Sequence, residues 1–200
     1  MIFITIGESP RDDVIPELLT IVGKNLPYRE IGLIDGIAPS AYTPYSADDL
    51  LVSKRKDGTI AYVSHRWVRE RLSKMKFHEL TVLLCTAEFD SDKLILPYKV
   101  IDAFFHALPR FQSATIVVPE IDQCEYAKKR WAKMAQELNC VSFSPYEKRE
   151  MDLDLTNQQL IYLDCIGFTL EHEKLFRDRT RGFVLSARKI LGNYLRTLLS

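Results

Sequence analysis

The 200-residue sequence lacks a surplus of charge, a long apolar run and the common nucleotide- and metal-binding motifs. Its 27 basic and 27 acidic residues cancel, so no basic face for nucleic acid or an anionic membrane is indicated. No uncharged stretch approaches the length that spans a bilayer, and residues 1–6 are too short, with no positive flank, for a signal peptide. No Gly-x-Gly-x-x-Gly, P-loop or His-Glu-x-x-His motif occurs. We therefore expect a cytoplasmic protein that uses no metal or cofactor and binds neither nucleic acid nor membrane.

Cysteine is scarce and shows no pattern, because no Cys-x-x-Cys pair and no cysteine-histidine motif occurs. The four cysteines are Cys85, Cys124, Cys140 and Cys165. Their wide spacing argues against a structural zinc site and a disulfide framework, so we interpret all four as free thiols. A free cysteine often only packs in a core, so a chemical role for any of them depends on its place in the fold.

Apolar runs alternate with segments of helical periodicity along most of the chain. Strands are predicted at residues 2–6, 31–34, 82–85, 113–118, 140–143, 160–165 and 183–185. Helices are predicted from the 7–13 loop to about 22, and over 65–77, 97–108, 121–138, 171–176 and 186–198. Residues 50–54 and 59–64 flank Asp57-Gly58, a strong hairpin signal, and the polar segment 147–159 has room for one short helix. This alternation predicts parallel sheets wrapped by helices, whose ligands bind at the carboxyl ends of the strands.

Cys85 and Cys165 differ from the other two cysteines because each ends an apolar strand. A thiol at the end of a parallel strand lies near the N-terminus of the next helix, where the helix dipole and free N–H groups favour the thiolate. Such a thiolate removes a proton as a base or attacks a carbonyl as a nucleophile. Two strand-end cysteines about eighty residues apart predict two halves of the chain that face each other.

Several groups beside these cysteines are suited to holding an anion. Thr86, Thr169 and the backbone around Gly167 offer hydrogen-bond donors to a carboxylate. The alternative role for the two threonines is helix capping. Glu88 is a candidate acid or base, and Asp164 is a candidate for orienting a neighbour or capping a helix, although both residue types are more often structural.

The loop after the first strand reaches the same sheet edge as the first of these cysteines if the sheet is parallel. Gly7 lets a ligand approach the backbone, Ser9 offers a hydroxyl, and Arg11 can clamp a carboxylate with two hydrogen bonds. The alternative is a turn in which Arg11 pairs with a nearby carboxylate. The candidates are Asp12, Asp13 and Glu88.

Taken together, these motifs resemble the AroM family, and the resemblance covers nearly the whole chain. The motifs are Thr-Ile-Gly-Glu-Ser-Pro-Arg-Asp-Asp (5–13), Leu-Ile-Asp-Gly (33–36), the hairpin with Asp57-Gly58 that ends at Val63-Ser64, Leu-Cys-Thr-Ala-Glu-Phe (84–89), Val-Val-Pro (117–119), Ser-Pro-Tyr (144–146) and Leu-Asp-Cys-Ile-Gly-Phe-Thr (163–169). One departure is Ala87, which stands where the family commonly has glycine.

Membership of this family implies kinship with the aspartate/glutamate/hydantoin racemase superfamily, whose members bind a small carboxylate or related substrate between two similar α/β lobes. In those racemases two cysteines face each other across the substrate and no pyridoxal phosphate is used. One cysteine removes the α-proton, and the other returns a proton to the opposite face. Cys85 and Cys165 fall on the two matching positions. The racemases usually have asparagine after the first cysteine and threonine after the second, where this chain has Thr86 and Ile166.

We therefore expect an α/β fold of two similar Rossmann-like (flavodoxin-like) lobes with mainly parallel sheets, a cleft between them and a β-hairpin in the first lobe. Residues 1–96 and 186–200 are assigned to the N-terminal lobe, and residues 97–185 to a smaller C-terminal lobe. The second lobe is expected to be the smaller one because the segment between Tyr146 and Leu160 is too short for the full crossover helix of the family.

The predicted function is that of a cofactor-independent racemase- or isomerase-like enzyme on a small carboxylate, an amino acid or hydantoin-like compound. Cys85 and Cys165 form the predicted acid/base pair. Substrate binding is assigned to Gly7, Ser9, Arg11, Thr86, Glu88, Gly167 and Thr169. Two alternatives stay open, a decarboxylase-like enzyme that uses one cysteine and a ligand-binding or sensing protein without catalysis. The sequence also permits a homo-oligomer.

Overall fold

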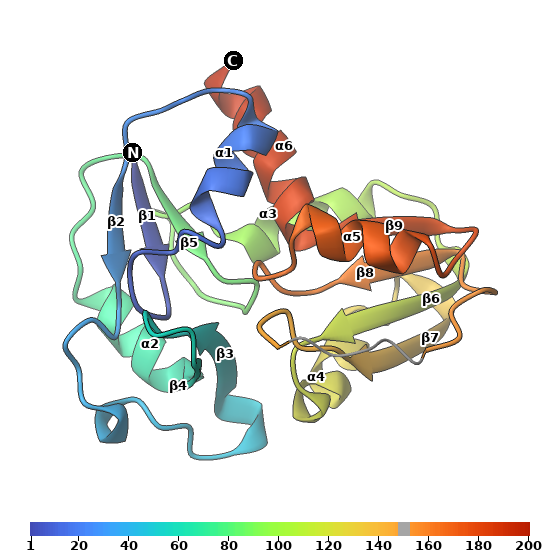
Figure 1. The fold of residues 1–200 in the computed structure, drawn as a ribbon, viewed down its shortest axis with the longest axis horizontal. Helices are drawn as coiled ribbons and strands as arrows, with labels where there is room; N and C mark the ends of the chain where they lie inside the picture. Colours follow the sequence, from blue (N-terminus) through green and yellow to red (C-terminus); the bar gives the residue numbers. More distant parts are fainter. Residues whose placement is uncertain (148–152) are drawn as a thin grey trace.

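Two parallel sheets and one hairpin form the framework of the fold, in a computed structural model that describes residues 1–147 and 153–200 (Figure 1). The first sheet has the order β2 (Arg29–Gly32), β1 (Ile2–Thr5), β5 (Thr81–Leu84). The second has the order β7 (Ala135–Ser142), β6 (Phe111–Val118), β8 (Leu160–Leu163), β9 (Phe183–Ser186). The antiparallel hairpin consists of β3 (Leu50–Lys54) and β4 (Ile60–Ser64). The predicted α/β class, with parallel sheets and a β-hairpin, is confirmed.

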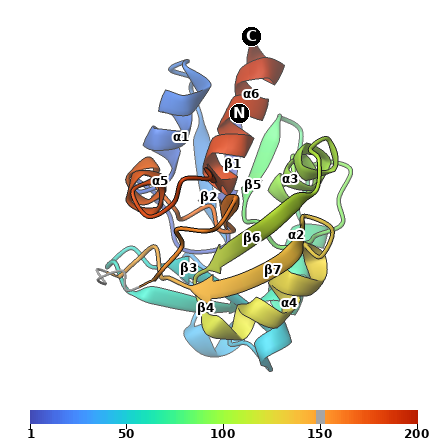
Figure 2. The same cartoon turned by 90° about the vertical axis from the view of Figure 1, so that its right-hand side faces the viewer.

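Helices connect the strands and cover the sheets. They are α1 (Ile15–Val22), α2 (His65–Ser73), α3 (Pro97–His106), α4 (Cys124–Arg130), α5 (Leu170–Arg177) and α6 (Ala187–Leu199), with short 3-10 turns η1 (Pro39–Ala41), η2 (Ala47–Asp49) and η3 (Ile121–Gln123). Figure 2 shows α4 beside β7, along one side of the second sheet. The helix at α1 ends at Gly23, as predicted, because Gly23 adopts a left-handed conformation with φ of 77°.

Buried aliphatic side chains explain why the central strands form. Every residue of β1, β5 and β8 is buried, as expected for strands that are covered on both faces. In the first sheet Thr5 pairs with Leu84, and in the second Val117 pairs with Leu163. These registers bring the segments that follow paired strands to the carboxyl edge of each sheet. Cys85 lies at this edge of the first sheet, and the segment after β8 lies at this edge of the second.

The last helix, α6, packs with elements from the start of the chain. Leu191 and Leu195 of α6 share a buried cluster with Phe3 of β1 and Leu18 of α1. Figure 1 shows α6 lying against α1. A Cβ atom on Gly192 would come within 2.5 Å of a methyl carbon of Ile21, so the two helices approach more closely than a larger residue allows. The division into lobes at 96/97 and 185/186 stays a prediction.

The long helix predicted over residues 121–138 is wrong. The structure has η3 and α4 up to Arg130, and residues 135–142 form β7 instead. Apolar residues at helical spacing in this segment fit a helix, namely Ala127, Trp131, Met134 and Leu138. Residues 135–142 form a strand instead, because β7 pairs in parallel with β6, from Phe111 opposite Ala135 to Val118 opposite Ser142. The strand predicted at 140–143 is therefore the end of a longer edge strand.

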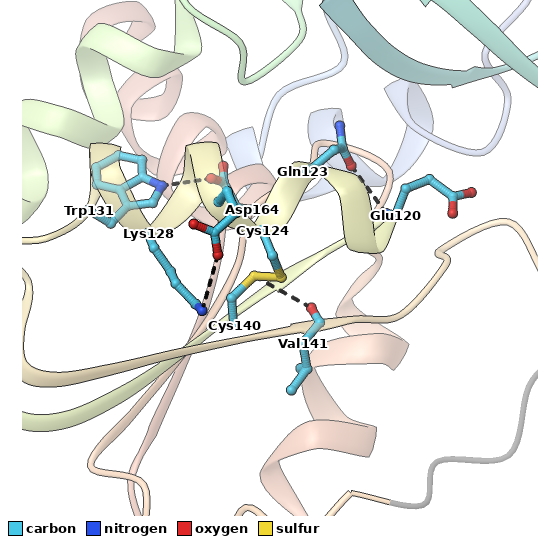
Figure 3. The surroundings of a disulfide bond; sticks show 9 residues. Glu120, Gln123, Cys124, Lys128, Trp131, Cys140, Val141 and Asp164 are labelled. Atoms are coloured by element: carbon cyan, nitrogen blue, oxygen red, sulfur yellow. Dashed lines mark hydrogen bonds and ion pairs between the residues drawn. A yellow bond between two sulfur atoms is a disulfide. The ribbon is translucent and has the colours of Figure 1, made fainter. Parts of the chain in front are cut away.

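The interpretation of all four cysteines as free thiols is also wrong. Cys124 and Cys140 form a disulfide with a Cα–Cα distance of 5.6 Å (Figure 3). Cys124 opens α4 and Cys140 lies in β7, and the chain turns back between them after Arg130. A continuous helix would have carried the two residues apart, so the error follows from the error in the helix. Cys85 and Cys165 are free, as predicted.

Two further expectations concern the polar segment and the membrane. Residues 153–159 hold turns and no helix, while residues 148–152 of the predicted polar segment lie outside the described residues. No helix in the described part of the chain is both long and apolar enough to cross a bilayer.

Candidate functional site

A cavity of about 260 Å³ lies where the segments after the central strands of both sheets meet the hairpin. Each of these parts of the fold contributes to its lining. The first sheet contributes Cys85, Thr86 and Glu88, the second contributes Asp164 and Cys165, the hairpin contributes residues 50–53, and α4 contributes Tyr126 and Arg130. The hairpin, whose role the sequence left open, therefore forms part of the cavity wall.

The two free thiols line this same cavity, and each cysteine is 8% exposed. The backbone N–H of Gly167 donates to the Cys165 Sγ at 3.3 Å. The pKa of Cys85 is raised to about 12, chiefly by burial and also by a charge on Cys165, although a hydrogen bond from the Ala87 backbone opposes the shift. Burial also raises the pKa of Cys165, although Gly167 and Tyr146 oppose the shift. Both thiols are therefore protonated at neutral pH before a substrate binds.

Tyr146 is a cavity residue that the site prediction missed. Its hydroxyl lies 4.0 Å from the Cys165 Sγ and 3.5 Å from Nη2 of Arg11. Burial raises the pKa of this tyrosine, and a charge on Cys165 raises it further. The Ser-Pro-Tyr motif directly after a predicted strand was the available signal in the sequence, since strand ends in parallel sheets carry binding residues.

Arg11 lines the cavity, but all five of its N–H donors have acceptors. Nε and Nη2 bind the two carboxylate oxygens of Asp13 at 2.8 and 2.9 Å. Nη1 donates to the hydroxyls of Thr5 and Ser53, each at 3.1 Å, and Nη2 also donates to Tyr146. Burial opposes the charge, but Tyr146 and Asp13 outweigh it, so the pKa of Arg11 is raised. The sequence offered pairing with Asp13 as the alternative, and the substrate-clamping role of Arg11 stays a prediction.

Gly7 and Ser9 lie outside the cavity lining formed by the described residues. A Cβ atom on Gly7 would lie 2.3 Å from the Ser53 Oγ, so this glycine lets the hairpin pack against the loop after β1. Ser9 donates from its backbone N–H and its hydroxyl to the carboxylate of Asp35 at 2.9 and 2.5 Å. Their contacts hold the loop in place, and their predicted roles in substrate binding stay predictions.

Thr86 and Glu88, by contrast, do line the cavity. The Thr86 carbonyl accepts a hydrogen bond of 2.6 Å from Arg130 Nη1, and the Thr86 hydroxyl donates to the Asp164 carbonyl at 3.5 Å. The Glu88 side chain is half exposed, with Oε1 3.7 Å from Arg130 Nε. The Glu88 carbonyl lies 2.6 Å from the His65 Nε2.

Thr169 and Gly167 make contacts within the chain rather than with the cavity. Thr169 is the N-cap of α5, where its hydroxyl accepts from the His172 backbone N–H, the capping role that the sequence offered as the alternative. Gly167 allows close packing, because a Cβ atom there would lie 2.5 Å from the Tyr146 hydroxyl oxygen. Neither residue belongs to the lining as far as the described chain defines it.

Asp164 is fixed by two buried aromatic donors. Trp131 Nε1 donates to one carboxylate oxygen at 2.6 Å (Figure 3), and the Tyr162 hydroxyl donates to the other at 3.1 Å. Burial raises the pKa of Tyr162 well above its usual value, and the charge of Asp164 adds to this. The carboxylate thus orients neighbours beside Cys165, one of the two roles that the sequence suggested. No group of three or more potential metal ligands occurs in residues 1–147 and 153–200.

The fold and this site define a class of α/β protein in which two thiols, one at the end of each parallel sheet, line one cavity of small-molecule size. The chain belongs to the AroM family, because the model of that family, described as AroM protein, matches residues 1–199. Comparison with curated proteins and with solved structures found no match.

Proposed function

We propose that the protein is a cofactor-independent racemase- or isomerase-like enzyme that acts on a small carboxylate, an amino acid or hydantoin-like compound. The observation that carries the proposal is the presence of Cys85 and Cys165, the two free cysteines of the chain, in the lining of a single cavity of about 260 Å³. The resemblance of the AroM motifs to those of the aspartate/glutamate/hydantoin racemase superfamily supports it.

The proposed reaction needs one thiolate and one thiol. The thiolate takes the α-proton, so that a C–H bond breaks and an S–H bond forms. The thiol then gives its proton to the opposite face of the same carbon, so that an S–H bond breaks and a C–H bond forms. The product has inverted configuration, and the two cysteines have exchanged protonation states. The reverse reaction uses the same steps.

We assign to Cys165 the thiolate that forms on substrate binding, when its proton leaves for solvent. Its sulfur has the Gly167 N–H at 3.3 Å and the Tyr146 hydroxyl at 4.0 Å, and the charge of Arg11 stabilises the thiolate further. The repulsion between charges on Cys85 and Cys165 then favours ionisation of only one thiol at a time. Substrate binding completes the site by excluding water, which strengthens the electrostatic stabilisation of the carbanion.

The test is proton exchange in deuterated water with a panel of amino acids and hydantoins. We expect α-deuteration and inversion with the unaltered protein, measured by mass spectrometry and chiral chromatography. Cys85→Ala and Cys165→Ala should each abolish inversion, because each removes one of the two proton carriers. A panel without any cysteine-dependent deuteration would contradict the proposal.

A second candidate function is ligand binding or sensing without catalysis. The observation that favours it is burial of both thiols, which raises their pKa values and works against thiolate formation at neutral pH. Thermal stabilisation by small carboxylates, without consumption of any of them, would support this candidate. A decarboxylase-like enzyme with one proton-donating cysteine would instead lose turnover with one alanine substitution and keep it with the other.

A further inference from the structure

Arg130 places a buried positive charge in the cavity lining. Its side chain is 7% exposed, and it reaches the cavity from the end of α4. Nη1 donates to the Thr86 carbonyl at 2.6 Å, and the guanidinium carbon lies 4.3 Å from the centre of the Trp131 ring. The hydrogen bond and the ring hold the guanidinium in one orientation, which a site for a small anion requires.

One end of this guanidinium has no hydrogen-bond acceptor. Nη2 of Arg130 is buried and lacks a partner among the described residues. A buried donor without an acceptor costs free energy, and the cost is larger for a charged group. Arg11, the other buried arginine of the cavity, has an acceptor for each donor. Arg130 therefore has an N–H donor that is available to a ligand, whereas Arg11 has none.

The nearest carboxylates do not supply the missing acceptor. Glu88 is half exposed, and its Oε1 lies 3.7 Å from Nε, too far for a hydrogen bond. The two carboxylate oxygens of Asp164 already accept from Trp131 and Tyr162. The unmet donor is therefore suited to an acceptor that comes from outside the chain.

We propose that Arg130 binds the anionic group of the ligand through Nη2, which a small shift of the guanidinium brings from its buried position to the cavity. The ligand then lies with its carboxylate toward α4 and its adjacent carbon toward the two thiols. The inference rests on the proposed function in one respect, that the ligand is a small carboxylate. It assigns substrate binding to a residue outside the set predicted from the sequence, which had Arg11 as the anion clamp.

Alkylation of the two free thiols tests this without knowledge of the substrate. Iodoacetate carries a carboxylate, whereas iodoacetamide is its neutral counterpart of nearly the same shape. At each of Cys85 and Cys165 we measure the iodoacetate rate divided by the iodoacetamide rate, by peptide mass spectrometry. We expect this ratio to fall about tenfold in Arg130→Gln. A general change in thiol pKa affects both reagents and leaves the ratio unchanged. An unchanged ratio in Arg130→Gln would overturn the assignment.

The matched control is Lys128→Gln, which removes an equal charge from the same helix at an exposed position. It should leave the ratio as in the unaltered protein, and an equal fall in both variants would overturn the assignment. The iodoacetamide rate must stay as slow as in the unaltered protein, which shows that the thiols of the variant remain enclosed.

Unaltered protein gives a second measurement that does not depend on folding of a variant. Acetate should slow alkylation by iodoacetamide, while acetamide at equal concentration should not. Equal effects of acetate and acetamide would overturn the assignment. Absence of an anion preference in the unaltered protein, with isotope exchange present, contradicts the role of Arg130 alone, whereas no exchange with the preference present contradicts the racemase alone.

Discussion

The guanidinium of Arg188 donates from Nε to the backbone carbonyl of Ile166 at 2.9 Å. That carbonyl belongs to the peptide group whose N–H, on Gly167, donates to the Cys165 Sγ at 3.3 Å. Arg188 is fully buried and also binds the Gly167 carbonyl at 3.1 Å and Glu17 at 2.7 Å. Hydrogen bonds in series polarise one another, so Arg188 strengthens the N–H donor that faces the thiol.

Replacing this arginine should change Cys165 more than Cys85. In Arg188→Lys we expect the pKa of the Cys165 thiol to rise and its alkylation at pH 8 to slow, because the polarised donor is weakened. The free energy of unfolding should fall by about 2 kcal/mol, for the loss of hydrogen bonds to two buried carbonyls. The measurement is the pH dependence of iodoacetamide labelling at each cysteine. Equal slowing at both thiols would contradict the link through the peptide group.

Stability at high pH should report the burial of Cys85. Its pKa is raised from 9.0 to about 12 in the folded state, so between these pH values the folded protein keeps a proton that the unfolded chain loses. The free energy of unfolding should therefore fall as the pH rises, with the contribution of Cys85 intact below pH 9 and lost near pH 12. Urea titrations of the unaltered protein and Cys85→Ala across this range isolate the effect. If the free energy of unfolding has the same pH dependence in both proteins, burial does not raise the pKa of Cys85.

The disulfide between Cys124 and Cys140 should contribute to stability, because it closes a loop with a sequence separation of 16. For a loop of this length we expect the double variant Cys124→Ser/Cys140→Ser to lose roughly 3 kcal/mol in the free energy of unfolding. A reductant should destabilise the unaltered protein and leave the double variant unaffected, which serves as the control. Disulfides are rare in reducing compartments, and the cytoplasmic location stays a prediction.

Gly7 should be intolerant of a side chain. In Gly7→Ala the new Cβ would lie 2.3 Å from the Ser53 Oγ and 2.5 Å from the Lys54 carbonyl oxygen. Because the second contact is with backbone, the hairpin must shift, and we expect a loss of about 1–3 kcal/mol in the free energy of unfolding. Ser53→Ala combined with Gly7→Ala relieves only the first contact. Full recovery of stability in that double variant would show that the backbone contact does not matter.

Local sequence patterns were sufficient for the features that depend on few residues. Asp57-Gly58 predicted the hairpin because Gly58 can adopt its positive φ of 90°, and the apolar run at 160–163 predicted the fully buried β8. The segment at 135–142 was assigned wrongly, since its structure depends on pairing with β6, more than fifteen residues away. The disulfide depends on the same turn of the chain and could not be read from the spacing of the two cysteines.

The cavity was predictable where strand ends mark it. The position after an apolar strand identified Cys85 and Cys165, and the structure brings both to one cavity. Arg130 was not identified, because it follows Lys128 and Lys129 in the sequence and looks like part of a solvated basic face. Its burial depends on Trp131 and on Thr86 from the other sheet, which no local pattern reveals.

The packing of α6 against α1 has a consequence for the order in which the protein assembles during synthesis. Leu191 and Leu195 complete the cluster around Phe3, and they follow the whole second sheet in the sequence. The face of the first sheet that they cover is therefore closed only in part, by α1, until the second sheet has been translated. The addition of α6, rather than the pairing of the first sheet, is the event that completes this core.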